Sequence, residues 1–258
     1  MKYTVDDLIN IMIKLRSENG CPWDKVQTHE SIKRSMIEEA YEAVEALDNK
    51  DDKMFANELG DVLLQVVFHA RIAEERGAFN FDDVVYEICN KLIERHPHVF
   101  GTISAENEDK ALDVWENSKK KEKNLKSYTD ALKDVPINFP ALIRAEKVQK
   151  KAKKAGFDWD SADGALQKVY EELEEIKQAQ KNKNQDEIDE EFGDFLFAAV
   201  NVGRFLNSDP EICLTNATNK FVGRFEKMEA LARQRNVDLK ELSLEELDNL
   251  WNKVKSEE

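Results

Sequence analysis

The sequence predicts an all-α protein built from two copies of one helical module in tandem. Three observations point to this fold class. The 258 residues include only nine glycines and five prolines, too few for the many turns of a β architecture. Apolar residues recur at helical spacing, as in Val5, Leu8, Ile9 and Met12. A series of acidic and aromatic landmarks also occurs twice in the same order, which is typical of a repeated structural unit.

The first half of the chain is expected to form a series of amphipathic helices. Periodicity and stop signals place them at 5–19, 31–47, 52–76, 81–95 and 106–123. We expect a turn at 21–24 and a helix stop at Gly77. His96-Pro97-His98 resembles a metal motif, but a proline there favours a helix stop that does not present His98 on a helix.

A linker is expected between the two modules. The helical pattern weakens from 124 to 139, and Pro136 and Pro140 interrupt it. Pro140 suits the start of a helix that runs to Lys154. The predicted division is therefore an N-terminal module at 1–123, a linker at 124–139, and a C-terminal module at 140–258.

Charge and cysteine content exclude several classes of protein. The formal net charge is −15, and such a field repels nucleic acid, so we expect no nucleic-acid partner. Cys21, Cys89 and Cys213 are far apart and form no CxxC pair, which indicates reduced thiols in a cytoplasmic protein. No apolar stretch of about 18 residues occurs, so we expect no membrane span.

The repeat is clearest in two acidic motifs. Residues 38–42 correspond to 171–175, and residues 58–63 correspond to 191–196. The same interval separates the two motifs in both halves. Upstream, 20–24 corresponds to 156–160, and downstream, Lys91 and Arg95 correspond to Lys220 and Arg224. Four landmarks in one order predict a duplication.

The acidic motifs predict a metal site in each module. Residues three apart on a helix share a face, so two antiparallel helices would gather four carboxylates around one point. A single pair of this kind is usually a solvated face, but the duplication and the mid-helix Gly60 and Gly193 favour a site. Hard divalent cations relieve such repulsion, and Mg²⁺ is the expected ion, with Mn²⁺ a possible substitute. The predicted ligands are Glu172, Glu175, Glu191 and Asp194, with a second possible set at Glu39, Glu42, Glu58 and Asp61.

Basic and aromatic residues supply candidate contacts for a nucleotide. Lys168, Lys220 and Arg224 could bind phosphate oxygens, and Trp251 could stack on a base. The ordinary alternatives are an exposed Lys220–Arg224 pair and a core or interface role for Trp251. We also assign four acidic residues to the substrate side of the site: Glu187, Asp189, Glu190 and Asp194.

Other catalytic classes lack their motifs. The chain has no G-x-x-x-x-G-K-[ST] segment, which excludes a P-loop nucleotidase. None of the four histidines belongs to HExxH or Glu-x-x-His, so zinc proteases and ferritin-type di-iron bundles are also excluded.

Taken together, these motifs resemble the MazG family of nucleotide pyrophosphohydrolases. The resemblance is carried by Cys21-Pro22-Trp23-Asp24 with Gln27-Thr28-His29, by the EExxE and ExxD pairs, and by residues 95–101, and it covers nearly the whole chain. It implies an all-α fold, an active site in a helical bundle usually completed by dimerisation, and hydrolysis of nucleoside triphosphates to monophosphate and pyrophosphate. Family metal ligands match Glu172, Glu175, Glu191 and Asp194, and family nucleotide contacts match Lys168, Lys220, Arg224 and Trp251.

The mechanism expected from these parts needs no covalent nucleophile. Glu171, next to Glu172, is a candidate to accept the proton of the attacking water together with Glu172.

We expect catalysis chiefly in the C-terminal module, because Ser35 stands where that module has Lys168, and Met54, Ala56 and Asn57 stand where it has Glu187, Asp189 and Glu190. We also expect a homodimer that covers apolar residues such as Phe195, Phe197 and Val200.

Two alternatives stay open. One is a helical regulatory or scaffold protein that binds metal without turnover. The other keeps the fold but narrows the substrate to dUTP or dCTP. The sequence does not fix the base or the sugar, since stacking on tryptophan tolerates every base.

Overall fold

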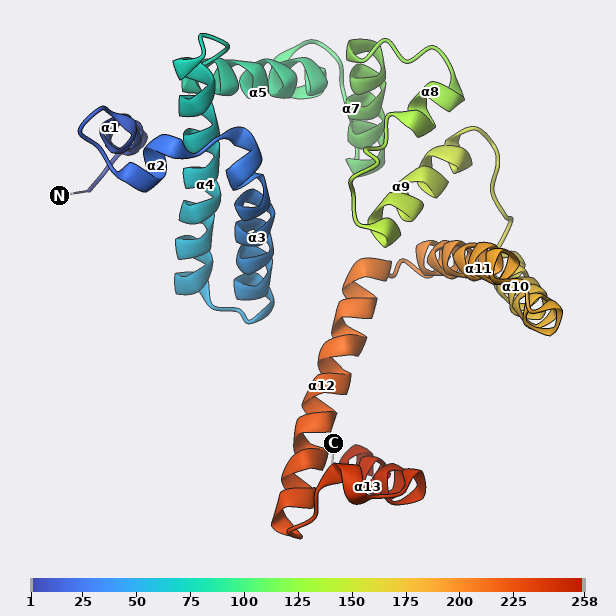
Figure 1. The fold of residues 1–258 in the computed structure, drawn as a ribbon. Helices are drawn as coiled ribbons and strands as arrows, with labels where there is room; N and C mark the ends of the chain where they lie inside the picture. Colours follow the sequence, from blue (N-terminus) through green and yellow to red (C-terminus); the bar gives the residue numbers. More distant parts are fainter. Residues whose placement is uncertain (1, 257–258) are drawn as a thin grey trace. The chain divides into compact units, whose positions relative to one another are not determined.

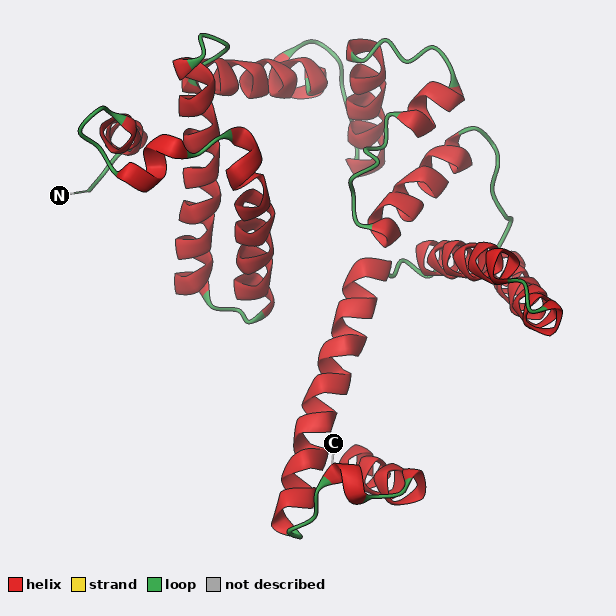
Figure 2. Cartoon of the chain, viewed as in Figure 1, coloured by secondary structure: helices red, strands yellow, loops and turns green. Residues whose placement is uncertain are grey.

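The structure is a computed structural model that describes residues 2–256, apart from the side chain of Lys120. Figure 2 shows helices joined by loops, and no strand occurs within the described range. The predicted all-α class is confirmed. The chain divides into two compact units, Met1–Glu122 (unit 1) and Lys123–Glu258 (unit 2).

Unit 1 is built from helices, three of which enclose a small buried core (Figure 1). Its helices are α1 (Val5–Arg16), α2 (Pro22–Val26), α3 (His29–Asp48), α4 (Asp52–Glu75), α5 (Phe81–Arg95), α6 (Pro97–Phe100) and α7 (Glu108–Glu122). Met12, Ile32, Val67, Phe68 and Ile72 form a buried cluster that joins α1, α3 and α4. Each fully buried side chain of this size stabilises the fold by roughly 1.5–3 kcal/mol.

Unit 2 contains a second pair of long neighbouring helices. Its elements are α8 (Tyr128–Lys133), α9 (Ala141–Lys154), α10 (Ala162–Asn182), α11 (Gln185–Phe205), α12 (Pro210–Gln234), a 3₁₀ turn at Leu239–Glu241, and α13 (Leu244–Ser256). Helix α8 lies within the stretch predicted as a linker. A buried cluster of Met228, Ala232, Leu250 and Val254 packs α13 against α12.

The repeat is visible in the two helix hairpins, α3–α4 and α10–α11. In each, the helices pack closely along their length and are joined by a short turn. One residue of each turn adopts a left-handed conformation, Lys50 at φ 56° and Lys183 at φ 55°. These lysines occupy corresponding positions, so the repeat extends to the backbone of the connecting turn.

Two local predictions were wrong. Residues 22–26 form helix α2 rather than an open turn, because Pro22 stands at the first helical position, where its missing N–H costs nothing. Pro97 likewise begins the one-turn helix α6, so His98 is presented on a helix after all. The predicted stop at Gly77 is confirmed, since its φ of 67° ends α4.

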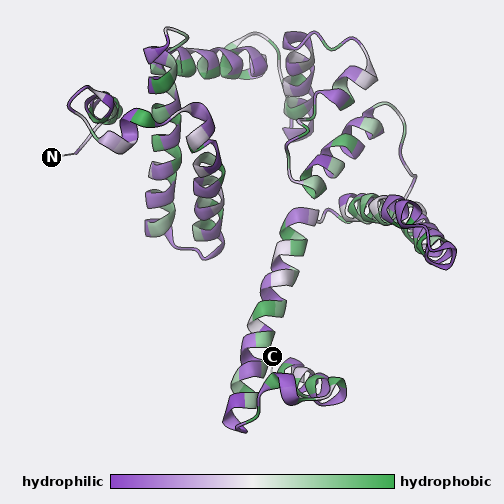
Figure 3. Ribbon diagram, in the orientation of Figure 1, coloured by the Kyte–Doolittle hydropathy of each residue, from purple (hydrophilic) through white to green (hydrophobic). Residues whose placement is uncertain are grey.

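Hydrophobic residues are interleaved with polar ones along the helices (Figure 3). Among the described residues, none of the helices combines the length and the apolar character that a membrane crossing needs.

Candidate active site

The α10–α11 hairpin gathers carboxylates from both of its helices. Glu172 and Glu175 come from α10 and Glu191 from α11, and each offers an oxygen within 4.8 Å of the others. The side chain of Glu172 is almost fully buried, and its Oε2 accepts no hydrogen bond from the described residues. Asp194 stands one turn after Glu191, is exposed, and lies outside this group of three.

Mutual repulsion shapes the electrostatics of this cluster. The contact with the Glu172 carboxyl raises the pKa of Glu175, and burial adds to the shift. The pKa of Glu191 is raised by burial first, and then by the charges of Glu172, Glu190 and Asp194. Hard oxygen ligands, crowded charge and a buried oxygen with no hydrogen bond fit a divalent cation.

Lys168 acts as an internal counter-ion to the cluster. Its Nζ lies 2.6 Å from Glu172 Oε1 and 2.7 Å from Glu171 Oε1. Hydrogen bonds to Glu171 and then to Glu172 raise the pKa of Lys168. The lysine predicted to contact phosphate thus contacts a predicted metal ligand instead.

The remaining acidic candidates of α11 lie near its start. Glu187 accepts a hydrogen bond from Asn182 at 3.1 Å, across the hairpin turn. Asp189 accepts one from Gln185 at 2.7 Å. Glu190 is exposed, and its charge contributes to the raised pKa of Glu191.

The predicted nucleotide contacts form a group of their own. Arg224 of α12 lies with its Cζ 5.9 Å from the ring centroid of Trp251, and that ring lies 5.1 Å from Phe221. Trp251 is half-buried and packs against the α12–α13 core, while Lys220 is exposed. In Figure 1, α13 packs near the end of α12 that is remote from α10–α11. Trp251, which belongs to α13, therefore lies at that end of α12.

Unit 1 has a matching carboxylate group on α3–α4. Glu39, Glu58 and Asp61 each offer an oxygen within 4.8 Å of the others, whereas Glu42 lies outside the group. Burial raises the pKa of Glu39, and the charges of Asp61, Glu42 and Glu58 raise it further. Asn57 Nδ2 donates to Glu58 Oε1 at 3.2 Å and more weakly to Asp61 at 3.4 Å.

Sequence reasoning missed the amides beside this second group. The sequence pattern identifies Asn57 only as a less acidic counterpart of Glu190, and it does not single out Gln65. The available signal was spacing: Gln65 follows Asp61 by four residues and is polar within an apolar stretch of α4.

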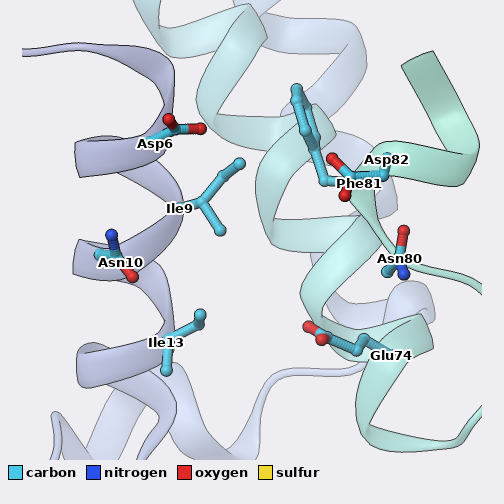
Figure 4. Close-up of a pocket in the computed structure, with 8 residues that line it drawn as sticks. All are labelled: Asp6, Ile9, Asn10, Ile13, Glu74, Asn80, Phe81 and Asp82. Carbon is cyan, nitrogen blue, oxygen red and sulfur yellow. The ribbon is translucent and has the colours of Figure 1, made fainter.

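One cavity of about 410 Å³ lies between α1, α4 and the start of α5 in unit 1 (Figure 4). Its lining is Asp6, Ile9, Asn10, Ile13, Glu74, Asn80, Phe81 and Asp82. No residue of either carboxylate group is among them.

Comparison with known proteins identifies the family. A profile of the MazG nucleotide pyrophosphohydrolase domain matches residues 27–100 and again 161–237. The chain belongs to the MazG family. Each matched segment contains one carboxylate hairpin, so the MazG domain occurs twice, once in each unit.

Relatives match over nearly the whole chain. The nucleoside triphosphate pyrophosphohydrolase/pyrophosphatase MazG of Thermotoga maritima is 49% identical over 97% of this chain and 95% of its own length. The nucleoside triphosphate pyrophosphohydrolase of Escherichia coli K12 is 42% identical over 98% of both. The uncharacterised protein YabN of Bacillus subtilis is 46% identical over 96% of this chain and 51% of its own length. The similarity to the Thermotoga and Escherichia relatives thus extends over both units of this chain.

Proposed function

We propose that this chain hydrolyses nucleoside triphosphates to nucleoside monophosphate and pyrophosphate, with Mg²⁺ as the metal and Mn²⁺ as a substitute. The observation that carries the proposal is the buried Glu172, with an oxygen that accepts no hydrogen bond, inside a group of carboxylates. Membership of the MazG family and the activities named for the Thermotoga and Escherichia relatives support the same reaction. They weigh against a scaffold that only binds metal.

In this proposal the α10–α11 hairpin holds the metal through Glu172, Glu175, Glu191 and Asp194. When bound, Mg²⁺ supplies charge for the triphosphate and makes water a better nucleophile. Asp194, exposed and one turn from Glu191, is free to reach the ion or the substrate. Phosphoryl chemistry of this kind depends on positioning and charge, so no covalent enzyme intermediate is needed.

Lys168 and Glu171 change partners during the proposed reaction. The Lys168 ammonium group forms ion pairs with both Glu172 and Glu171. Glu172 would hold the metal, and the Lys168 ammonium group would then be available to contact a phosphate oxygen. The exposed Glu171 is then left as a base for the proton of the attacking water. Glu187, Asp189 and Glu190 stand on the same helix as candidates for ordering the substrate and its waters.

We infer that a homodimer completes the site. Trp251 lies on α13, which packs near the end of α12 that is remote from the hairpin, and the hairpin exposes large apolar side chains. Those on its surface are Leu166, Tyr170, Leu173, Phe192, Leu196 and Phe197. Of the residues predicted to bury against a second copy, Phe197 fits this role, while Val200 is already buried within the chain. A dimeric mass by light scattering is expected, and a monomer at micromolar concentration would contradict it.

The three free cysteines support a cytoplasmic location.

The decisive experiment identifies the bond that is cleaved. The purified chain is incubated with ATP and Mg²⁺, and adenine nucleotides are separated over time. AMP should appear without ADP, because cleavage lies between the α- and β-phosphates. Orthophosphate alone would not discriminate, since a pyrophosphatase step like that named for the Thermotoga relative would also release it. ADP as the first product would refute the proposal. Parallel assays with each ribo- and deoxynucleotide, dUTP and dCTP included, test for base selectivity.

A further inference from the structure

Helix α7 of unit 1 packs against α5 through a contact between an arginine and a tryptophan (Figure 1). The Cζ of Arg95 lies 5.5 Å from the ring centroid of Trp115, and the Nζ of Lys119 lies 5.2 Å from the same centroid. Unit 2 contains the same kind of contact, because the Cζ of Arg224 on α12 lies 5.9 Å from the ring centroid of Trp251 on α13. The repeat between the units therefore includes an arginine held against a tryptophan of a later helix.

A carboxylate of unit 1 engages the guanidinium group of Arg95 at two points. The Nε and Nη2 atoms of Arg95 donate to the two carboxylate oxygens of Glu122 at 2.7 and 3.0 Å. The side chain of Arg95 is only 15% exposed, and that of Glu122 is 27% exposed. A guanidinium group binds a phosphate through the same paired geometry that it uses for a carboxylate. The Glu122 carboxylate thus stands where Arg95 would hold two oxygens of a phosphate group.

We propose that Arg95 and Trp115 form a nucleotide site in unit 1, and that Glu122 closes this site by occupying the position of a phosphate group. The inference rests on the proposed function, because it takes the corresponding Arg224 and Trp251 as nucleotide contacts of unit 2. The ligand is a nucleoside phosphate. An indole ring offers a surface on which any base can stack, and a guanidinium group offers paired donors to phosphate oxygens. Closure by Glu122 keeps the nucleotides that bind to unit 2 out of unit 1.

Neighbouring cations suit this site to an anion, although the chain as a whole has a net charge of −15. Lys91, whose Nζ lies 3.8 Å from Glu87 in an exposed pair, stands one turn before Arg95 on α5. Lys119 places an ammonium group beside the indole ring, and its flexible stem allows it to leave the ring to a base and to reach a phosphate instead. A largely buried guanidinium group is costly without an anion, so Arg95 should recruit one from solution when its partner carboxylate is neutralised.

The test counts the nucleotide sites per chain with a ligand that is not cleaved. The full-length protein is titrated by calorimetry, in the presence of Mg²⁺, with an ATP analogue that has a methylene group between its α- and β-phosphates. We expect one site in the unaltered chain, at unit 2, and an additional site in the Glu122→Gln protein, because the affinity of unit 1 should rise roughly 10–100-fold. Adding Trp115→Leu to Glu122→Gln should remove the additional site. A Glu122→Gln protein that gains no site, or an unaltered chain with two sites of equal affinity, would overturn the proposal.

A matched variant and a second measurement separate a closed site from an ordinary ion pair. Glu106→Gln removes the same charge from an exposed pair with Lys110, and it should add no site. Glu122→Gln should lower the melting temperature of the free protein, and the analogue should then raise it by more than it does in the unaltered chain. An ion pair that serves only structure would lower the melting temperature equally with and without the analogue. That pattern would refute the proposal even if the Trp115→Leu protein did not fold.

Failure of this inference is distinguishable from failure of the proposed function. If the unaltered chain releases AMP from ATP but Glu122→Gln gains no site, only the closure is refuted. If the unaltered chain neither releases AMP nor binds the analogue, the proposed function is refuted. A site gained in Glu122→Gln and lost again with Trp115→Leu would then still support a nucleotide site in unit 1.

Discussion

The hairpins α3–α4 and α10–α11 are two copies of one helix pair that carries acidic motifs. Both place glutamates at corresponding positions and join their helices through a left-handed lysine, Lys50 or Lys183. They differ in how the crowded carboxylates are compensated. Unit 2 uses a lysine cation, Lys168, whereas unit 1 uses the amides of Asn57 and Gln65. Duplication thus kept the backbone geometry, and a few side-chain replacements separate the chemistry of the two sites.

The largest expected difference between the hairpins is in turnover. Glu172→Gln should lower kcat/KM at least about 100-fold, because one ligand charge is lost where metal and triphosphate meet. Glu39→Gln should leave kcat/KM within about twofold, since unit 1 is not expected to carry the reaction. The measurement is AMP release from ATP at saturating Mg²⁺ for both variants.

Circular dichroism of the two proteins provides the control, because a Glu-to-Gln change preserves shape and should preserve helix content. If Glu39→Gln is dead and Glu172→Gln active, the assignment is reversed. Equal partial losses would mean that both hairpins turn over substrate.

Much of the fold, and less of the site, could be predicted from sequence. Helices such as 81–95 and 141–154 were predicted correctly because helical periodicity and caps are local. Helix α2 was missed because five residues give no period. Spacing does not predict that Lys168 pairs with Glu172. Nor does it predict that Asp61 belongs to the carboxylate group of unit 1 while Asp194 lies outside that of unit 2. These depend on side-chain rotamers and on burial, which only the packed hairpin determines.

The next largest expected effect is on the free energy of unfolding. It concerns one largely buried arginine in each unit, Arg16 and Arg204. Arg16 of α1 binds Glu75 at the end of α4 and the backbone carbonyls of Asp24 and Gln27. Arg204 of α11 binds Asp158 in the loop before α10. Arg204→Met should cost about 2 kcal/mol of unfolding free energy, because it leaves a largely buried carboxylate without its main partner.

Arg16→Met should cost less, about 1.5 kcal/mol, because Glu75 keeps Arg71 at 3.0 Å. Urea unfolding of both variants, monitored by circular dichroism, gives the two values. A larger loss at Arg16 than at Arg204 would show that its backbone contacts matter more than the ion pair.

The dependence of stability on pH should also differ between the metal-free and the metal-bound protein. Folding raises the pKa of Glu39, Glu175 and Glu191, so the native state binds protons more tightly than the unfolded chain. Without metal, their contribution to stability therefore grows as pH falls from about 7 toward about 5 and is lost as pH rises. The pKa of Glu75 is lowered by Arg16, so its opposing contribution is lost only at lower pH.

Melting temperatures between about pH 5 and 7, with chelator and with Mg²⁺, measure this effect. Divalent metal should flatten the profile, because it favours the ionised carboxylates. Glu191→Gln should flatten the metal-free profile as well. A metal-free protein that gains stability steadily toward neutral pH would contradict the conclusion that crowding raises the pKa of these carboxylates.

The smallest predicted effect concerns the matched glycines of the two hairpins. Gly60 and Gly193 stand mid-helix between the acidic residues of their motifs, and a Cβ added at either would meet no described atom within 4 Å. Alanine in place of a mid-helix glycine should therefore stabilise the chain by about 0.5–1 kcal/mol at each site. Since the chain itself does not require these glycines, the open side of α11 at Gly193 suits close approach by substrate or a second copy. Gly193→Ala should accordingly raise the melting temperature while also raising KM or weakening the dimer, whereas Gly60→Ala should raise the melting temperature alone. Nucleotide titration and light scattering of the two variants test the contrast. A stabilised Gly193→Ala protein with unchanged KM and mass would show that the glycine serves neither contact.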